Sequence, residues 1–142
     1  MLVQVNVKGR DGLLLAARIL LALLFVIYGW DKLVGFHGTV QYLAGAGLPL
    51  PAVAAVIAVV MELGVGIALV LGVATRPLAL LLALYTLATA LIGHHFWTMT
   101  GMHRMSNAIN FYKNISIIGG LLALYAAGPG KYSIDARGGK TA

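Results

Sequence analysis

The feature that most constrains this chain is a long apolar run that holds a single charged residue. Residues 48–74 read LPLPAVAAVIAVVMELGVGIALVLGVA, and Glu62, near the middle, is the only charge among them. About 20 apolar residues at ~1.5 Å rise each are enough to cross the ~30 Å hydrocarbon core of a bilayer. A carboxylate at that depth costs at least ~2.5 kcal/mol unless it is paired, protonated or facing a wet cavity. The run therefore predicts a membrane-spanning helix whose buried acid needs a partner.

Composition favours a polytopic membrane protein over a soluble globular domain. Hydrophobic residues make up 61% of the 142 residues, and charged residues only 10%. The net charge is +6, but the basic residues lie mostly at the ends of apolar runs and in the tail. That pattern is typical of membrane orientation and argues against a nucleic-acid-binding face. The chain has no cysteine, which excludes a disulfide, a thiolate nucleophile and cysteine-ligated metal centres within it.

Three further apolar runs extend this interpretation to an all-α, four-transmembrane-helix bundle. We expect a single domain over residues 1–135 and a polar basic tail at 136–142, with spans at about 13–34, 49–74, 77–98 and 108–127. The first run is longer than the apolar region of a signal peptide, and no small-x-small cleavage site follows it. We therefore expect an uncleaved first span.

The distribution of basic residues predicts the orientation. Four spans place both termini on one side, together with the turn at residues 75–77, and this side holds Lys8, Arg10, Arg76, Lys131, Arg137 and Lys140. The opposite side holds Lys32, Arg104 and Lys113. By the positive-inside rule, both termini are expected in the cytoplasm.

The first span carries a cation that could neutralise the buried acid. Arg18, Phe25, Gly29 and Lys32 share one helical face. Counted along the helices, Arg18 lies ~9 Å and Glu62 ~18 Å from the cytoplasmic face. We therefore favour an Arg18–Glu62 ion pair, direct or through water. The alternative is that Arg18 snorkels to the headgroups while Glu62 stays protonated.

Polar side chains gather in the outer half of the predicted bundle, namely Tyr28, Lys32, His94, His95, Asn110 and Asn114. Such donors around an apolar cavity suit a quinone, whose carbonyls need donors and whose reduction needs protons. In this hypothesis Glu62 carries protons, and His94 or His95 donates to a carbonyl. Arg18 supplies a countercharge, while Tyr28 and Asn114 orient the ring. The alternative is a polar end of the third span at the water interface.

Metal binding is the weaker interpretation of the same region. The stretch HHFWTMTGMHRM contains soft and borderline ligands that could hold copper, but no spacing in it is diagnostic. The i, i+4 histidine pair of a two-histidine site is missing. Haem would need axial ligands on facing helices, and only His94 or His95 is placed for one side. We predict no metal.

Several sequence pieces together resemble the DoxX family of small bacterial four-helix membrane proteins. They are Arg18 in the first span, the histidine-aromatic end of the third span, and the segments YGWDKLVGF, GLPLP, MELGVGIALVLGVATRPLAL, NFYKN and GPGKYSID. The resemblance covers about residues 13–135 and implies a bundle in the bacterial inner membrane. It also implies a redox association, because the family is named for a subunit linked to a thiosulfate:quinone oxidoreductase. The family-like polar positions are Arg18, Lys32, Glu62, His94 and Asn114.

Three functions are left open. The first is a membrane subunit that interacts with quinone or quinol on behalf of a protein partner in a redox complex. The second is a non-catalytic anchor or assembly subunit, in which Arg18 and Glu62 only fix helix register. The third is a small-solute or lipid transporter, although the chain lacks the paired repeats of broken helices typical of transporters. A homo-oligomer is compatible with all three, and a channel would need one.

Overall fold

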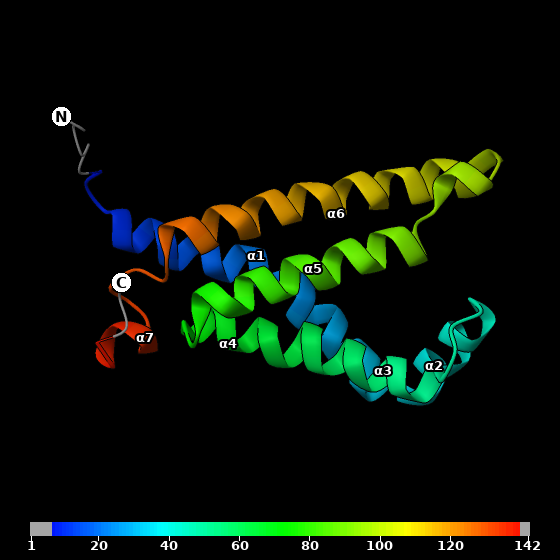
Figure 1. Cartoon of the computed structure of the whole chain (residues 1–142), viewed down its shortest axis with the longest axis horizontal. Coiled ribbons are helices and arrows are strands. Elements are labelled where there is room, and N and C mark those ends of the chain that lie inside the picture. The colour runs from blue at the N-terminus through cyan, green and yellow to red at the C-terminus, as the bar shows by residue number, and fades with distance from the viewer. Residues whose placement is uncertain (1–6, 140–142) are drawn as a thin grey trace.

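The computed structural model describes residues 7–139, and all regular structure among them is helical (Figure 1). In chain order the elements are α1 (Arg10–Val34), α2 (Phe36–Gly45), α3 (Pro51–Val59), the π-helix η1 (Val60–Val65), α4 (Gly66–Leu71), α5 (Thr75–Gly93), the 3₁₀-helix η2 (Phe96–Thr98), α6 (Gly101–Ala127) and α7 (Ile134–Arg137). Because α3, η1 and α4 follow one another without a break, they form one rod over Pro51–Leu71. The expected all-α fold is confirmed.

The long helices form two hairpin-like pairs that meet in the core. Helix α1 packs along the rod of α3, η1 and α4, α5 packs along α6, and α1 also contacts α6 (Figure 1). Arg10 Nη2 at the start of α1 donates to the carbonyl of Ala127 at the end of α6, over 3.2 Å. The two ends of the described chain therefore lie together, at the end of the molecule that also holds the α4–α5 turn. We call this the terminal end and the opposite one the distal end.

Three helices are long and apolar enough to cross a membrane: Arg10–Val34, Pro51–Leu71 and the segment Thr75–Thr98. Large apolar side chains are exposed along them, among them Leu20, Ile57 and Leu84. Exposed apolar surface on this scale has no stable place in water and fits contact with lipid. Helix α6 is 27 residues long but is not among the three, and its first half carries polar residues including Asn107, Asn110 and Lys113. The polytopic membrane class is confirmed, whereas the number of spans is not.

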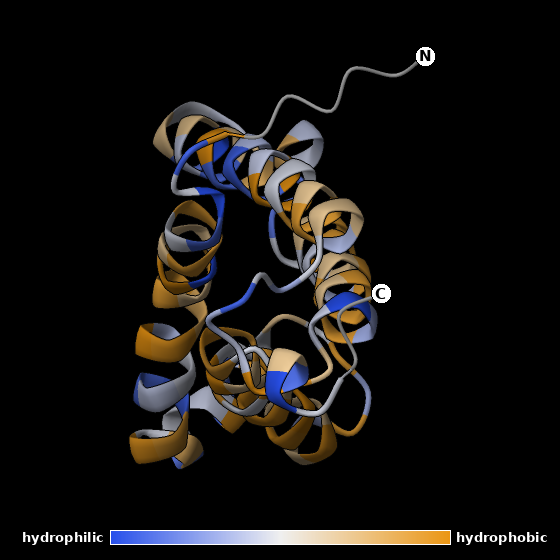
Figure 2. Cartoon of the chain, turned by 90° about the vertical axis from the view of Figure 1, so that its left-hand side faces the viewer, coloured by the Kyte–Doolittle hydropathy of each residue, from blue (hydrophilic) through white to orange (hydrophobic). Residues whose placement is uncertain are grey.

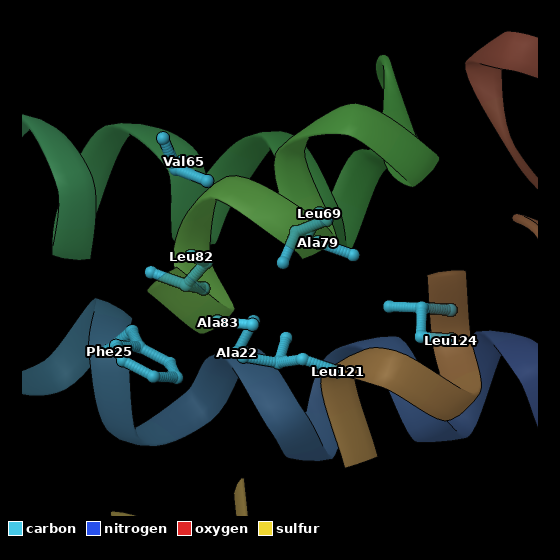
Figure 3. Packing of buried hydrophobic residues seen from close by; sticks show 9 residues of the cluster. All are labelled: Ala22, Phe25, Val65, Leu69, Ala79, Leu82, Ala83, Leu121 and Leu124. Atoms are coloured by element: carbon cyan, nitrogen blue, oxygen red, sulfur yellow. The ribbon is translucent and has the colours of Figure 1, made fainter. Parts of the chain in front are cut away.

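The hydrophobic core lies toward the terminal end. It joins α1, the rod, α5 and α6 through Ala22, Phe25, Val65, Leu69, Ala79, Leu82, Ala83, Leu121 and Leu124 (Figure 3). Small residues in this set let neighbouring backbones approach closely. At the distal end, α2 and the tip that joins α5 to α6 lie apart (Figure 1). Viewed from the terminal end, hydrophobic residues dominate the helices, and the short α7 near the viewer is partly hydrophilic (Figure 2).

Helix boundaries differ from the expected spans mainly around the third loop. Helix α5 ends at Gly93, so His94 and His95 lie beyond it rather than on it. Helix α6 begins at Gly101, seven residues before the expected span at 108–127. A helix needs no apolar residues outside the hydrocarbon core, because water and headgroups satisfy its exposed groups there. The start of the expected tail at 136–142 belongs to α7, and residues 140–142, including Lys140, lie outside the described residues.

Candidate functional site

The buried acid of the rod is held by two side chains from neighbouring helices. Glu62 lies in η1 and is only 8% exposed. Lys32 of α1 places Nζ 2.7 Å from Oε2 of Glu62, an ion pair and a hydrogen bond. Tyr85 of α5 donates its hydroxyl to the other carboxylate oxygen, Oε1, also over 2.7 Å. This Lys32–Glu62–Tyr85 network ties α1, η1 and α5 together at one level of the bundle.

Close backbone contact between α1 and η1 positions this network. A Cβ atom on Gly29 would lie 2.5 Å from the backbone nitrogen of Leu63 and 2.9 Å from the carbonyl carbon of Glu62. Only glycine fits at such a distance, and Lys32 follows three residues later on the same face. The π-helical turn also surrounds Glu62, and π-helical insertions in α-helices are frequent at functional sites.

The expected Arg18–Glu62 pair is wrong, and the register of α1 against the rod explains why. Gly29 lies level with Leu63, whereas a Cβ on Gly72 would touch Nη1 of Arg18, so the guanidinium of Arg18 is level with Gly72. Ten residues separate Glu62 from Gly72, which is ~15 Å along the rod. Counting residues along the sequence separates the depths of Arg18 and Glu62 by only ~9 Å, because such a count starts from assumed membrane boundaries. Lys32, on the same face of α1 as Arg18, is the cation at the level of the acid.

Arg18 instead lies fully buried beneath the C-terminal segment. Its Nη2 donates to the backbone carbonyl of Tyr132, and Asp135 is close enough to act on it electrostatically. Within residues 7–139, Nε and Nη1 of Arg18 have no hydrogen-bond partner. The guanidinium therefore fixes the chain that follows α6 instead of neutralising the acid in the middle of the rod.

Asp135 completes this attachment at the α4–α5 turn. Its Oδ1 accepts from the backbone N–H of Ala74 over 2.8 Å, and its Oδ2 accepts from that of Thr75 over 2.9 Å. The backbone N–H of Asp135 in turn donates to the carbonyl of Gly72 over 2.9 Å. Ala74 has a φ of +45°, a left-handed conformation that costs a non-glycine residue roughly 1–2 kcal/mol. The carboxylate thus stabilises a strained turn and caps the start of α5.

Lys32 is the member of the network that reaches the surface. Its side chain is 32% exposed, and its Nζ lies 5.9 Å from the ring centroid of Tyr28, which is itself 52% exposed. Both residues belong to a helix long and apolar enough to span the membrane. The network is therefore buried at Glu62 and accessible from the surface of the helices at Lys32 and Tyr28.

The two histidines lie in a second polar group near the tip that joins α5 to α6. His94 Nδ1 is 3.0 Å from Asn107 Oδ1, and His95 Nδ1 is 2.8 Å from the carbonyl of Ile92. The tip also holds an aromatic cluster formed by Phe96, Trp97, Phe111 and Tyr112. Nine residues separate Tyr85 from His94, which is ~13 Å along the axis of α5. The structure places the histidines at a different level from Glu62.

The two asparagines of α6 take separate positions. Asn110 Oδ1 accepts from Lys113 Nζ over 2.9 Å, near the surface of the helix. Asn114 is 8% exposed and is one of the few buried residues of α6. Of the residues that the sequence suggested, the structure joins Glu62, Lys32 and Tyr28 into one site. No group of three or more His, Asp or Glu side chains suited to a metal ion occurs within residues 7–139.

Tyr85 and Asp135 are the contributors that sequence reasoning missed. A signal for Tyr85 existed, because Glu62 precedes the α4–α5 turn by about as many residues as Tyr85 follows it. In an antiparallel hairpin, equal distances from the turn place two residues at one level. Asp135 offered no such signal, since its partners are backbone N–H groups 60 and 61 residues away.

Comparison of the sequence with known proteins identifies its family. The DoxX family model matches residues 13–95, more than half of the chain. The chain belongs to the DoxX family. It is 56% identical to Inner membrane protein YphA of Escherichia coli (strain K12) over 129 residues, which cover 91% of this chain and 92% of that protein.

A second relative extends the match. Inner membrane protein YqjF of the same organism is 41% identical over 128 residues, covering 90% of this chain and 93% of that protein. No solved structure matches the chain. The resemblance noted in the sequence is therefore confirmed, and the chain is an integral inner-membrane protein. Arg18, Lys32, Glu62 and Tyr85 all lie within the part that the family model matches.

Proposed function

We propose that this DoxX-family protein binds quinone or quinol from the bilayer at the Lys32–Glu62–Tyr85 network, on behalf of a redox partner. The observation that carries the proposal is a buried carboxylate inside apolar helices whose lysine partner is one-third exposed on the helix surface. Charged groups within membrane spans are costly and usually mark a functional pathway. A ligand that travels in lipid is the one able to reach this site from the side.

The residues present fit a quinone headgroup. Lys32 has three N–H donors, one of which serves Glu62, so others are left for a carbonyl oxygen. Glu62 offers carboxylate lone pairs to a quinol hydroxyl, while Tyr85 holds the carboxylate in place. The exposed ring of Tyr28 beside Lys32 provides a flat apolar wall. A bound quinone would supply two-electron redox chemistry, and the chain's own residues would bind the headgroup and exchange protons with it.

The same proposal requires a partner protein. The chain has no cysteine to hold an iron–sulfur cluster or to act as a redox thiol. A small bundle that binds a quinone headgroup then needs another protein to deliver or take the electrons. The proposed roles of His94 and His95 in donating to a carbonyl stay predictions, since both lie past the end of α5, ~13 Å or more from the level of Tyr85.

The proposed topology has four spans with both termini in the cytoplasm. Helix α6 is long enough to cross, and it packs against α5 and returns to the terminal end. Among the described residues, the terminal end carries Arg10, Arg76, Lys131 and Arg137, which the positive-inside rule assigns to the cytoplasm. Lys113 and the asparagines of α6 would then lie in its outer half.

A second function is supported by the completeness of the network. Both oxygens of Glu62 already have a partner, so the site can serve as a register device between α1, the rod and α5. Buried polar contacts are used in some proteins to specify helix register without any chemistry. In that case the protein is an anchor or assembly subunit.

The experiment that separates the two is mass spectrometry of small molecules extracted from gently purified protein. We expect about one quinone per chain in the wild type, a loss in Glu62→Gln, and retention in the control Asp31→Asn, which alters an exposed acid on α1. Lys32→Arg should retain quinone because it keeps the charge, whereas Lys32→Met should not. Absence of quinone from a folded wild type would refute the proposal in favour of the register role.

A further inference from the structure

A second feature of the surface lies between α1 and α6, and none of its lining residues belongs to the Lys32–Glu62–Tyr85 network. The two helices lie side by side toward the terminal end (Figure 1). Their side chains leave an apolar groove of about 580 Å³. We call it the α1–α6 groove; its lining includes Leu14, Leu21, Leu24, Gly120, Ala127 and one cation, Lys113. A Cβ on Gly120 would lie 2.8 Å from Leu21 Cδ2, so the helices contact each other at its floor.

The groove leads into a polar hollow at the terminal end. This terminal basin has a volume of about 220 Å³ and is lined by Arg10, Asp11, Ala127, Pro129, Gly130 and Lys131. Ala127 lines both cavities, so the apolar groove and the basin are adjacent. The combination of a charged compartment at the membrane surface and an apolar groove running into the membrane matches an amphipathic molecule.

The charges of the basin favour an anionic headgroup. Arg10 and Lys131 are exposed cations, and Arg10 donates a hydrogen bond from Nη2 to the carbonyl of Ala127. The opposing charge, Asp11, accepts the backbone N–H of Lys131 through Oδ1 over 2.9 Å, so this oxygen anchors the loop. Lys131 Nζ lies 5.8 Å from the ring centroid of Tyr132, an exposed aromatic of the kind found at membrane interfaces. The basin carries one net positive charge.

The length of the groove fits a lipid chain of the adjacent leaflet. Fourteen residues separate Lys113 from Ala127, which is ~21 Å along α6. One leaflet contributes about half of the ~30 Å hydrocarbon core, so the groove covers its full depth. We propose that the groove and the basin together bind one anionic phospholipid, with its phosphate between Arg10 and Lys131 and an acyl chain along α1 and α6.

Native mass spectrometry of the whole protein, offered equal amounts of dioleoyl phosphatidylglycerol and dioleoyl phosphatidylcholine, tests this proposal. We expect one retained phosphatidylglycerol. Each Lys or Arg near an anionic headgroup contributes about fivefold, so Arg10→Gln combined with Lys131→Gln should lower the preference about twenty-five-fold. The charge-preserving pair Arg10→Lys and Lys131→Arg should keep it. The control pair Arg104→Gln and Arg137→Gln, outside the basin, should also keep it.

A second variant tests the groove apart from the charges. Ala123 lines the groove at an exposed position, so Ala123→Phe should fill it and reduce retention of the lipid at least tenfold. Ala88→Phe, at an exposed position of α5 outside the groove, is the matched control. Equal retention of both lipids by the wild type, or unchanged retention in Ala123→Phe, would overturn the proposal. Displacement of the lipid by inorganic phosphate alone would also overturn it, because it would indicate a free-anion site.

Discussion

Two cations on the same face of α1 meet entirely different partners, and the contrast explains much of the molecule. Lys32 pairs with a carboxylate of the adjacent rod, whereas Arg18 donates to a backbone carbonyl of the chain after α6. Fourteen residues, or ~21 Å, separate them along the helix. Lys32 is partly exposed, so its network opens onto the helix surface, while Arg18 is fully buried.

The contrast teaches that a shared helical face does not imply a shared role. At the level of Lys32, the absence of a side chain on Gly29 brings η1 and its acid close. At the level of Arg18, Gly72 leaves room for the guanidinium, and Ser133 also approaches the same glycine. In both places a glycine allows the close approach, but the element opposite determines whether the cation meets a carboxylate or a backbone carbonyl.

The largest expected effect comes from removing one partner of the ion pair. Lys32→Met should destabilise the protein by about 3 kcal/mol, because it leaves the Glu62 carboxylate buried without its countercharge. Adding Glu62→Gln to the same chain should restore most of that loss. Thermal unfolding in detergent measures both, with Lys113→Met as the control, since Lys113 is exposed and bonded only to a neutral amide. Equal losses in Lys32→Met and Lys113→Met would show that the pair contributes nothing.

Gly29→Ala should destabilise by about 2 kcal/mol, because the added methyl collides with the backbone of η1 and not with a flexible side chain. The matched control is Gly64→Ala within η1, where a Cβ meets nothing within 4 Å. Thermal unfolding of the two variants in one detergent provides the comparison. A Gly29→Ala protein as stable as Gly64→Ala would mean that α1 and η1 are farther apart than described.

Tyr85→Phe should cost about 1.5 kcal/mol, since it removes one hydrogen bond to a charged carboxylate without changing the shape of the side chain. It should also weaken quinone retention less than Glu62→Gln does, because Lys32 still holds the acid. Quinone content and unfolding temperature can be measured on one preparation. Quinone loss as complete as in Glu62→Gln would assign Tyr85 a direct contact with the headgroup.

At the level of Arg18, Asp135→Asn should lower the free energy of unfolding by about 1 kcal/mol, the usual contribution of a helix cap. The attachment of the C-terminal segment should loosen with little change in the core, so trypsin should cleave after Lys131 faster than in the wild type. Quinone retention should stay unchanged. If Asp135→Asn released quinone as readily as Lys32→Met, the two cation sites would be coupled rather than independent.

The smallest effect is expected for His94→Ala combined with His95→Ala. The histidines bond to Asn107 and to a carbonyl at the tip that joins α5 to α6, so stability should change by less than about 1 kcal/mol. Any quinol-linked activity of the complex with its partner is predicted to fall if the histidines donate to the headgroup. An unchanged rate would remove them from the site and leave Lys32 as its donor.

Much of this protein's fold could be predicted from its sequence, because the bilayer imposes simple physical requirements on the chain. Apolar runs of sufficient length require helices, since no water is present to satisfy the backbone, and this determined the all-α membrane class. Helical periodicity also placed Arg18, Phe25 and Gly29 on one face of α1, and all three are buried. The cost of a lone charge in lipid determined that Glu62 needs a partner.

Only the tertiary structure decided which partner that is. Periodicity places a residue on a face but says nothing about how far one helix slides along another. That sliding is set by contacts such as Gly29 against Leu63, where two backbones meet. It brings Lys32 and Tyr85 to Glu62 and leaves Arg18 ~15 Å away. The attachment of Asp135 to Ala74 and Thr75 depends on a fold-back of the chain after α6, which no local pattern encodes.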